Sequence, residues 1–186
     1  MLTEGSQVFY TRKGDTGYTD LLGDRVPKYH ARPETYGTID EATSFLGLAR
    51  ASAATERSKE IILKIQRDLY LMMAELAFAP DMEQHKFEMT QEHVDWIEGE
   101  TDRLSEEVEL PPHFIIPGDT FSGAALDSAR GIIRRAERLA VRLFHDEEIQ
   151  NEEVVAYLNR LSSLLFILAR YEDHAAGVIP TRAKQG

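Results

Sequence analysis

Apolar residues recur with helical spacing in five long blocks that fill most of the chain from residue 33 onward. The block over 152–175 shows the pattern well, because its apolar residues are three or four positions apart and so share one face of an α-helix. They are Val155, Leu158, Leu161, Leu165 and Leu168. No segment alternates strands with helices as an α/β protein does. The pattern therefore predicts an all-α protein, a bundle of five amphipathic helices.

Each predicted helix begins at a residue type that favours helix N-termini. Proline suits the first helical turn, and Ser, Thr and Asn side chains can accept a hydrogen bond from a free N–H group of that turn. The predicted helices are 33–54 (starting at Pro33), 58–79 (capped by Ser58), 90–107 (capped by Thr90), one beginning near Thr120 or Ser122, and 152–175 (capped by Asn151).

Residues 1–31 differ from the rest, since they are rich in glycine and lack helical periodicity. We expect a loop-rich N-terminal arm over 1–31, with a short extended piece at 7–11, and a helical bundle over 32–186 as one domain overall. The arm contains Thr11-Arg12-Lys13-Gly14-Asp15-Thr16-Gly17-Tyr18-Thr19. Glycines let backbone N–H groups approach a phosphate, and the basic side chains add charge, although the Walker A spacing is absent. Two interpretations stay open: a phosphate-binding loop and a flexible basic arm.

Four arginines recur every four residues in the predicted fourth helix and therefore share one of its faces. They are Arg130, Arg134, Arg138 and Arg142. Together with Arg135 and Glu137 they give the segment 130–142 a net charge of +4 (five arginines minus one glutamate), whereas the whole chain carries −11. The opposite side of this helix is apolar, so the segment has a core face and a cationic face.

Like charges four residues apart destabilise a helix, so an anion should lie against this cationic face. Arginine binds carboxylate and phosphate oxygens equally well through its planar fork. Asp40 and Glu41 of the first helix are candidate protein partners, and a polyanionic ligand is the other candidate. A solvated face with scattered salt bridges is the third interpretation.

Asn159 and Arg160 stand within the strongly apolar fifth helix. A buried amide or guanidinium group needs a hydrogen-bond partner or a ligand. We therefore expect Asn159 either to contact a nucleotide or to make a structural hydrogen bond between helices.

Composition excludes several kinds of protein. A net charge of −11 argues against general nucleic-acid binding, which needs a basic surface. The absence of cysteine excludes disulfides, a thiolate nucleophile and a zinc-thiolate site. Glu-x-x-His pairs, which a di-iron bundle needs, do not occur, and we expect no metal site built from side chains alone. The first residues lack the apolar core of a signal peptide, so we expect a cytoplasmic protein with no membrane partner.

Five stretches, in order and over nearly the whole chain, carry a family resemblance. They are TRKGDTGYTDLLGDRVPK, RPETYGTIDEATSFLGLA, FIIPG, ARGIIRRAER and YLNRLSSLLF. With these motifs the chain resembles the PduO-type ATP:cob(I)alamin adenosyltransferases, also called corrinoid adenosyltransferases.

The resemblance implies a ferritin-like, left-handed up-and-down bundle that forms a homotrimer with active sites between subunits. It implies transfer of the 5′-deoxyadenosyl group of ATP to the cobalt of cob(I)alamin, with Mg²⁺ assisting and triphosphate released. Cobalt(I) is itself the nucleophile in that reaction, so the protein only aligns the substrates and stabilises charge. Expected partners are ATP, a reduced corrinoid, and a reductase or a B12-dependent enzyme.

The resemblance also assigns site residues by matching positions. Arg134, Arg138 and Asp40 would be catalytic, with Asp40 pairing with Arg134 across the subunit boundary and Arg130 supporting that helix. Phe114 would contact the corrinoid. The ATP site would be lined by Thr11, Arg12, Lys13, Gly14, Thr19, Lys28, Arg134, Arg135, Glu137, Arg138 and Asn159.

Some positions depart from the family pattern. Asp119 stands where a second glycine is usual after Pro117, Asp127 replaces a histidine, and Ser163 replaces an aspartate. The first-helix motif, usually DELNS, reads DEATS over 40–44. These changes lie on the expected corrinoid side. They motivate an alternative function, an ATP-binding corrinoid sensor or carrier on the same fold with weak or no transferase activity.

Overall fold

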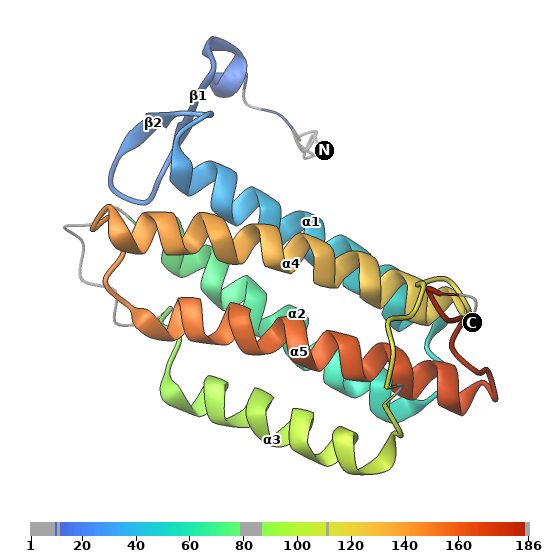
Figure 1. The fold of residues 1–186 in the computed structure, drawn as a ribbon. Helices are drawn as coiled ribbons and strands as arrows, with labels where there is room; N and C mark the ends of the chain where they lie inside the picture. Colours follow the sequence, from blue (N-terminus) through green and yellow to red (C-terminus); the bar gives the residue numbers. More distant parts are fainter. Residues whose placement is uncertain (1–9, 11, 79–86, 111, 185–186) are drawn as a thin grey trace, which may run out of the picture.

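Five α-helices make up almost all of the regular structure (Figure 1). The computed structural model describes residues 10, 12–78, 87–110 and 112–184. The helices are α1 (Ala31–Ser52), α2 (Glu56–Leu76), α3 (Gln91–Glu107), α4 (Phe121–His145) and α5 (Glu152–Ala175). The predicted all-α bundle of five helices is confirmed.

The helix starts follow the capping chemistry of the sequence with one exception. Thr90, Thr120 and Asn151 are the N-caps of α3, α4 and α5, as predicted. In α2 the cap is Thr55, whose hydroxyl accepts the Ser58 N–H at 3.1 Å, and Ser58 itself is buried in the first turn. The predicted Ser58 cap was wrong because Thr55, three residues earlier, has the extended backbone that a cap requires.

Helix packing places the apolar faces together. α1 lies along α2 and α4, α4 lies along α5, and α3 covers the side of α5 away from α4 (Figure 1). α4 is antiparallel to α5, since Asp127 near the start of α4 contacts Arg170 near the end of α5. The buried face of α4 consists of the apolar residues opposite the arginines, namely Ile132, Ile133, Ala136, Ala140 and Leu143.

The arm forms structure that the sequence did not predict. A short 3₁₀ helix, η1 (Lys13–Thr16), precedes an antiparallel hairpin of β1 (Tyr18–Asp20) and β2 (Arg25–Pro27). Leu22, in the turn of the hairpin, donates its N–H to the Ala77 carbonyl at 2.8 Å, which attaches the hairpin to the end of α2. Strands of three residues are too short to show period-2 alternation. The predicted extended piece at 7–11 lies, except for Tyr10, outside the described residues.

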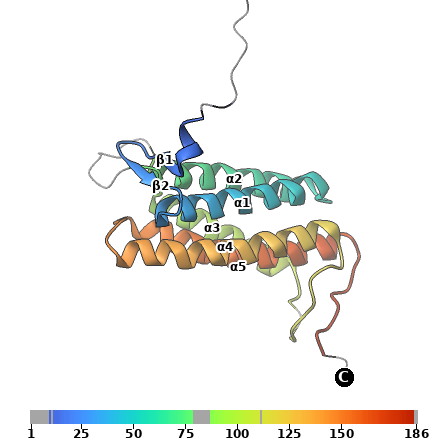
Figure 2. The same ribbon diagram turned by 90° about the horizontal axis from the view of Figure 1, so that it is seen from above.

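The two ends of the bundle carry different features. The hairpin lies at the end where α1 begins, whereas the C-terminus lies at the other end, beside the start of α4 (Figures 1 and 2). By length and composition α5 could cross a membrane, the only such helix among the described residues. However, 61% of its apolar stretch is buried inside the bundle, which is the pattern of a core helix.

Candidate active site

The arginines at the two ends of the α4 face have carboxylate partners nearby in sequence. Arg130 Nε lies 3.0 Å from Asp127 Oδ1, one turn earlier in the helix. Arg142 Nε lies 3.5 Å from Asp146 Oδ2, just after the helix ends. These two guanidinium groups are therefore neutralised within α4 and its C-cap.

Arg135 is paired with another helix. Its guanidinium forms an ion pair with Glu41 of α1, and both side chains are about half exposed. This contact confirms that an acid of the first helix lies against the arginine helix. Asp40, by contrast, is exposed, and among the described residues it makes no ion pair with Arg134. The pairing of these two residues stays a prediction that concerns a second subunit.

Arg134 and Arg138 are the arginines that stay without a partner. Both are exposed, and in the described part of the chain neither makes a hydrogen bond or ion pair through its side chain. Residues four apart in a helix are about 6 Å apart along its axis. Two unneutralised guanidinium groups at that separation suit the oxygens of a polyphosphate.

Asn159 lies beside this arginine pair. Its Nδ2 donates to Glu137 Oε1 at 2.7 Å, and Glu137 is the residue that precedes Arg138. The prediction that Asn159 and Arg160 are buried was wrong, because both face solvent between the buried Leu158 and Leu161. The hydrogen bond between helices, which was one of the two predicted outcomes for Asn159, is confirmed.

In the arm, Lys28 reaches back over the 3₁₀ helix. A Cβ atom at Gly14 would stand 2.9 Å from Lys28 Nζ, so glycine allows the ammonium group to approach the backbone there. Arg12 has a left-handed backbone (φ 61°) and its guanidinium lies 5.5 Å from the Tyr10 ring centre. Thr19 pairs with Val26 in the hairpin, and Thr11 lies outside the described residues.

Arg25 is an arm residue that the sequence analysis did not single out. Its Nη2 donates to the Lys13 carbonyl at 3.1 Å and lies 3.5 Å from Thr16 Oγ1, so it ties β2 to η1. The only signal for it was a positive charge in a glycine-rich segment. Across the described residues, Arg12, Gly14, Thr19 and Lys28 make no hydrogen bond or ion pair to α4. One chain therefore holds the arm and the arginine pair apart.

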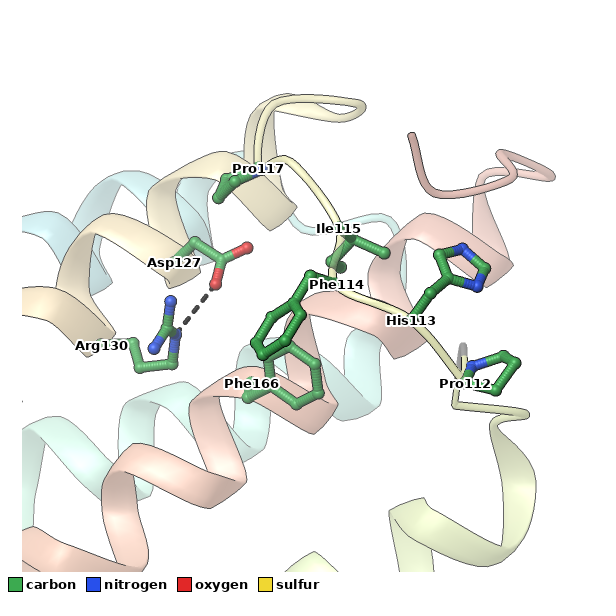
Figure 3. A pocket seen from close by; sticks show the side chains of 8 residues that line it. All are labelled: Pro112, His113, Phe114, Ile115, Pro117, Asp127, Arg130 and Phe166. Carbon is green, nitrogen blue, oxygen red and sulfur yellow. Dashed lines mark hydrogen bonds and ion pairs between the residues drawn. The ribbon is translucent and has the colours of Figure 1, made fainter. Parts of the chain in front are cut away.

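A pocket of about 510 Å³ opens at the start of α4 (Figure 3). Phe114, whose side chain is 89% exposed, and Phe166 of α5 stand on one side of it, while Asp127 and Arg130 stand on the other. The full lining is Pro112, His113, Phe114, Ile115, Pro117, Asp127, Arg130 and Phe166. The pocket thus combines an aromatic wall with a polar, ion-paired wall.

The polar wall belongs to a buried network. Asp127 Oδ2 accepts from Arg170 Nη2 at 2.9 Å, and Arg170 also lies 3.0 Å from Asp173. Burial raises the pKa of the Asp173 carboxyl, an effect opposed by the hydrogen bond from Thr120 and by the charge of Arg170. Asp127, noted above as a departure from the family pattern, is therefore the shared partner of Arg130 and Arg170.

Comparison with known proteins identifies the family. A model described as cobalamin adenosyltransferase matches residues 9–172. The chain belongs to the cobalamin adenosyltransferase family. The PduO-type resemblance found in the motifs is thereby confirmed.

Relatives of this adenosyltransferase come from several bacteria. A corrinoid adenosyltransferase from Bacillus subtilis is 39% identical over 91% of this chain and 88% of its own length. The corrinoid adenosyltransferase PduO of Salmonella typhimurium is 38% identical over 95% of this chain. The chain spans about half of that relative, 54% of its length.

Solved adenosyltransferase structures share the fold. A phenylalanine-to-alanine variant of a PduO-type ATP:corrinoid adenosyltransferase from Lactobacillus reuteri, complexed with cobalamin and ATP, has a TM-score of 0.88 and 32% identity. That match covers 96% of this chain and 100% of the other. An arginine-to-lysine variant from the same species, complexed with ATP, has a TM-score of 0.83 and 32% identity over 95% of this chain and 100% of the other.

Proposed function

We propose that this protein transfers the 5′-deoxyadenosyl group of ATP to the cobalt of cob(I)alamin and releases triphosphate. One observation carries the proposal: α4 lines the pocket with Arg130 and, one turn later, begins the unpartnered pair Arg134 and Arg138. A rise of 1.5 Å per residue puts Arg130 and Arg134 about 6 Å apart along the helix. A corrinoid in the pocket and a polyphosphate on the arginines would therefore be neighbours.

The chemistry matches what these residues can supply. The cobalt–carbon bond forms as the C5′–O bond breaks, and the electron pair of that bond leaves with the triphosphate. No side-chain nucleophile or base is required, so the protein contributes alignment and charge stabilisation. Arg134 and Arg138 face the departing phosphates, Arg135 supports them through Glu41, and the aromatic wall around Phe114 holds the apolar corrin face.

Mg²⁺ is proposed to enter with the phosphates of ATP. Magnesium is commonly held by one or two carboxylates together with substrate phosphates and water. Glu137 fits that role, because Oε1 accepts from Asn159 and Oε2 has no partner among the described residues. The bound ion would neutralise part of the phosphate charge, and Asn159 would orient the Glu137 carboxylate.

We further propose that the site is completed by a second subunit in a homotrimer. The separation of the arm from the arginine pair within one chain supports this arrangement. An exposed face of α1 is available for the contact and carries Gly37, Asp40, Ser44 and Leu48. The close packing that the sequence predicts at Gly37 is not made within the chain, where a Cβ atom would meet nothing within 4 Å. The arm residues Arg12, Lys13, Gly14, Thr19 and Lys28, with Thr11, would then close over ATP bound to the neighbour.

In the cell we expect a cytoplasmic enzyme that receives cob(I)alamin from a reductase or delivers its product to a B12-dependent enzyme. The alternative function, a corrinoid sensor or carrier, shares the ATP site but not the transfer. An anaerobic assay with ATP, Mg²⁺ and chemically reduced cobalamin distinguishes the two. Adenosylcobalamin formation, followed by the spectral change of cobalt alkylation, is the expected result. ATP binding without transfer would favour the sensor or carrier, with Ser163→Asp as the first reversion.

Replacement of Arg138 tests the anion site. A hydrogen bond to a charged group contributes about 1.5–3 kcal/mol, so Arg138→Ala should raise the Kd for ATP about 10- to 100-fold and lower turnover. Arg142→Ala is the matched control, since Arg142 lies on the same helix but is largely exposed and paired with Asp146. An Arg138→Ala protein that unfolds yet binds ATP with normal affinity would show that this arginine is structural.

A further inference from the structure

The loop that carries the pocket wall depends on the C-terminal segment for its backbone hydrogen bonds. We call residues 112–119 the pocket loop and residues 178–184 the tail. The Ile116 N–H donates to the Thr181 carbonyl at 2.9 Å, and the Ala183 N–H donates to the Phe114 carbonyl at 2.8 Å. Among the described residues these are the only backbone hydrogen bonds that the pocket loop makes. Phe114 therefore sits on a strand-like segment whose one neighbour is the tail.

The course of the tail is set where α5 ends. Gly177 adopts a left-handed backbone (φ 68°), which reverses the chain after the helix. The Val178 N–H then donates to the Asp173 carbonyl at 2.9 Å. These contacts direct the tail back toward the start of α4, where it pairs antiparallel with the pocket loop at Ile115 and Arg182.

Asp119 holds the tail with both carboxylate oxygens. Its Oδ1 accepts from the Thr181 hydroxyl at 2.6 Å, and its Oδ2 accepts from the Thr181 N–H at 2.8 Å. These two hydrogen bonds, the hydroxyl bond first, lower the pKa of the Asp119 carboxyl. Asp119 directly precedes Thr120, the N-cap of α4 that donates to Asp173. The carboxylate thus connects the tail to a rigid helix end.

We propose that Asp119 and Thr181 are positioning residues that set the affinity of the pocket for its corrinoid, by fixing the tail against the pocket loop. The identity of the ligand rests on the proposed function. The physical reason is preorganisation: a loop already held in its binding position loses less conformational entropy when the ligand arrives. The residue that replaces the usual glycine at position 119 is, in this chain, the one that makes the connection.

Three variants test the proposal. Thr181→Val keeps the side-chain shape but removes the hydroxyl donor, Asp119→Ala removes both acceptors, and Thr181→Ser is the conservative control that keeps the hydroxyl. Amide hydrogen exchange of Ile116 and Ala183 is measured on the ligand-free full chain. Equilibrium dialysis with cob(II)alamin and, separately, with ATP gives the two dissociation constants.

Loss of one such hydrogen bond corresponds to about a fivefold change in equilibrium. Thr181→Val and Asp119→Ala should therefore speed exchange at both amides about fivefold and raise the Kd for cob(II)alamin by a similar factor. The Kd for ATP should stay the same, Thr181→Ser should behave as wild type, and in the transfer assay KM for the corrinoid should rise with kcat unchanged.

The possible failures are distinguishable. Unchanged amide exchange in both variants would overturn the role of Asp119 in holding the tail. Faster exchange with an unchanged Kd for cob(II)alamin would show a structural contact without influence on the ligand, and would also overturn the proposal. A wild-type protein that shows no transfer would refute the proposed function, while the exchange and dialysis measurements would still decide the role of Asp119 and Thr181.

Discussion

Gly123→Ala should destabilise this protein, although the same substitution in a helix usually stabilises. Gly123 lies in the first turn of α4, where an added Cβ atom would stand 2.6 Å from Asp173 Oδ1 and 2.7 Å from Thr120 Oγ1. Those two atoms are joined by a 2.7 Å hydrogen bond, and Thr120 Oγ1 also accepts the Gly123 N–H at 3.0 Å. The methyl group must therefore displace a helix cap or a buried carboxylate.

The magnitude follows from what is displaced. Loss of a Thr N-cap costs about 1 kcal/mol, and loss of a hydrogen bond to a charged group costs about 1.5–3 kcal/mol. Exchange of glycine for alanine returns up to about 1 kcal/mol of helix propensity. The net expectation is a loss of about 2–3 kcal/mol in the free energy of unfolding.

Chemical denaturation followed by far-UV circular dichroism measures this change. Wild type and variant are compared at one protomer concentration, because self-association would make stability depend on concentration. Gly99→Ala is the matched control in the middle of α3, where the added Cβ atom would meet only Arg103 Nη2, at 3.9 Å. It should gain about 0.5–1 kcal/mol. A Gly123→Ala protein as stable as wild type would refute the steric argument.

Two further predictions concern assembly and pH. Arg134→Ala should weaken the homotrimer if Asp40 of a neighbouring subunit is its partner, and sedimentation velocity that shows an unchanged assembly would contradict this pairing. Burial raises the pKa of Glu75 above its ordinary value of 4.5, against hydrogen bonds from Met89 and Asn151. The carboxylate is therefore the disfavoured form in the fold, and Glu75 makes the protein less stable as pH rises from 4.5 through the folded-state pKa. An NMR titration of its side-chain carboxyl should give a midpoint above 4.5, and a midpoint below that value would refute the sign.

The local features of the fold could be predicted from the sequence. Apolar spacing placed the buried faces of all five helices, and Thr90, Thr120 and Asn151 marked three helix starts correctly. Each of these signals acts within about one helical turn, between residues that are near neighbours in the chain. The choice between Thr55 and Ser58 failed because both are good caps, and the backbone at position 55 decided between them.

The candidate site was predictable only in its composition. The sequence showed a row of arginines, and it suggested that carboxylates or a ligand oppose them. Which arginines stay unpartnered was decided in three dimensions, because Glu41 on α1 takes Arg135 and leaves Arg134 and Arg138. The motif resemblance supplied the remaining expected residues, whose roles are proposals for the experiments above.

The sequence by itself therefore determined the helices, their buried faces, the cationic face of α4 and the family. The tertiary structure decided the exposure of Asn159, the aromatic wall around Phe114 and the attachment of the tail to Asp119. The reason is the range of the interactions. Periodicity and capping join residues a few positions apart, whereas Asp119 and Thr181 are 62 positions apart and meet only because α5 and the tail return the chain to the start of α4.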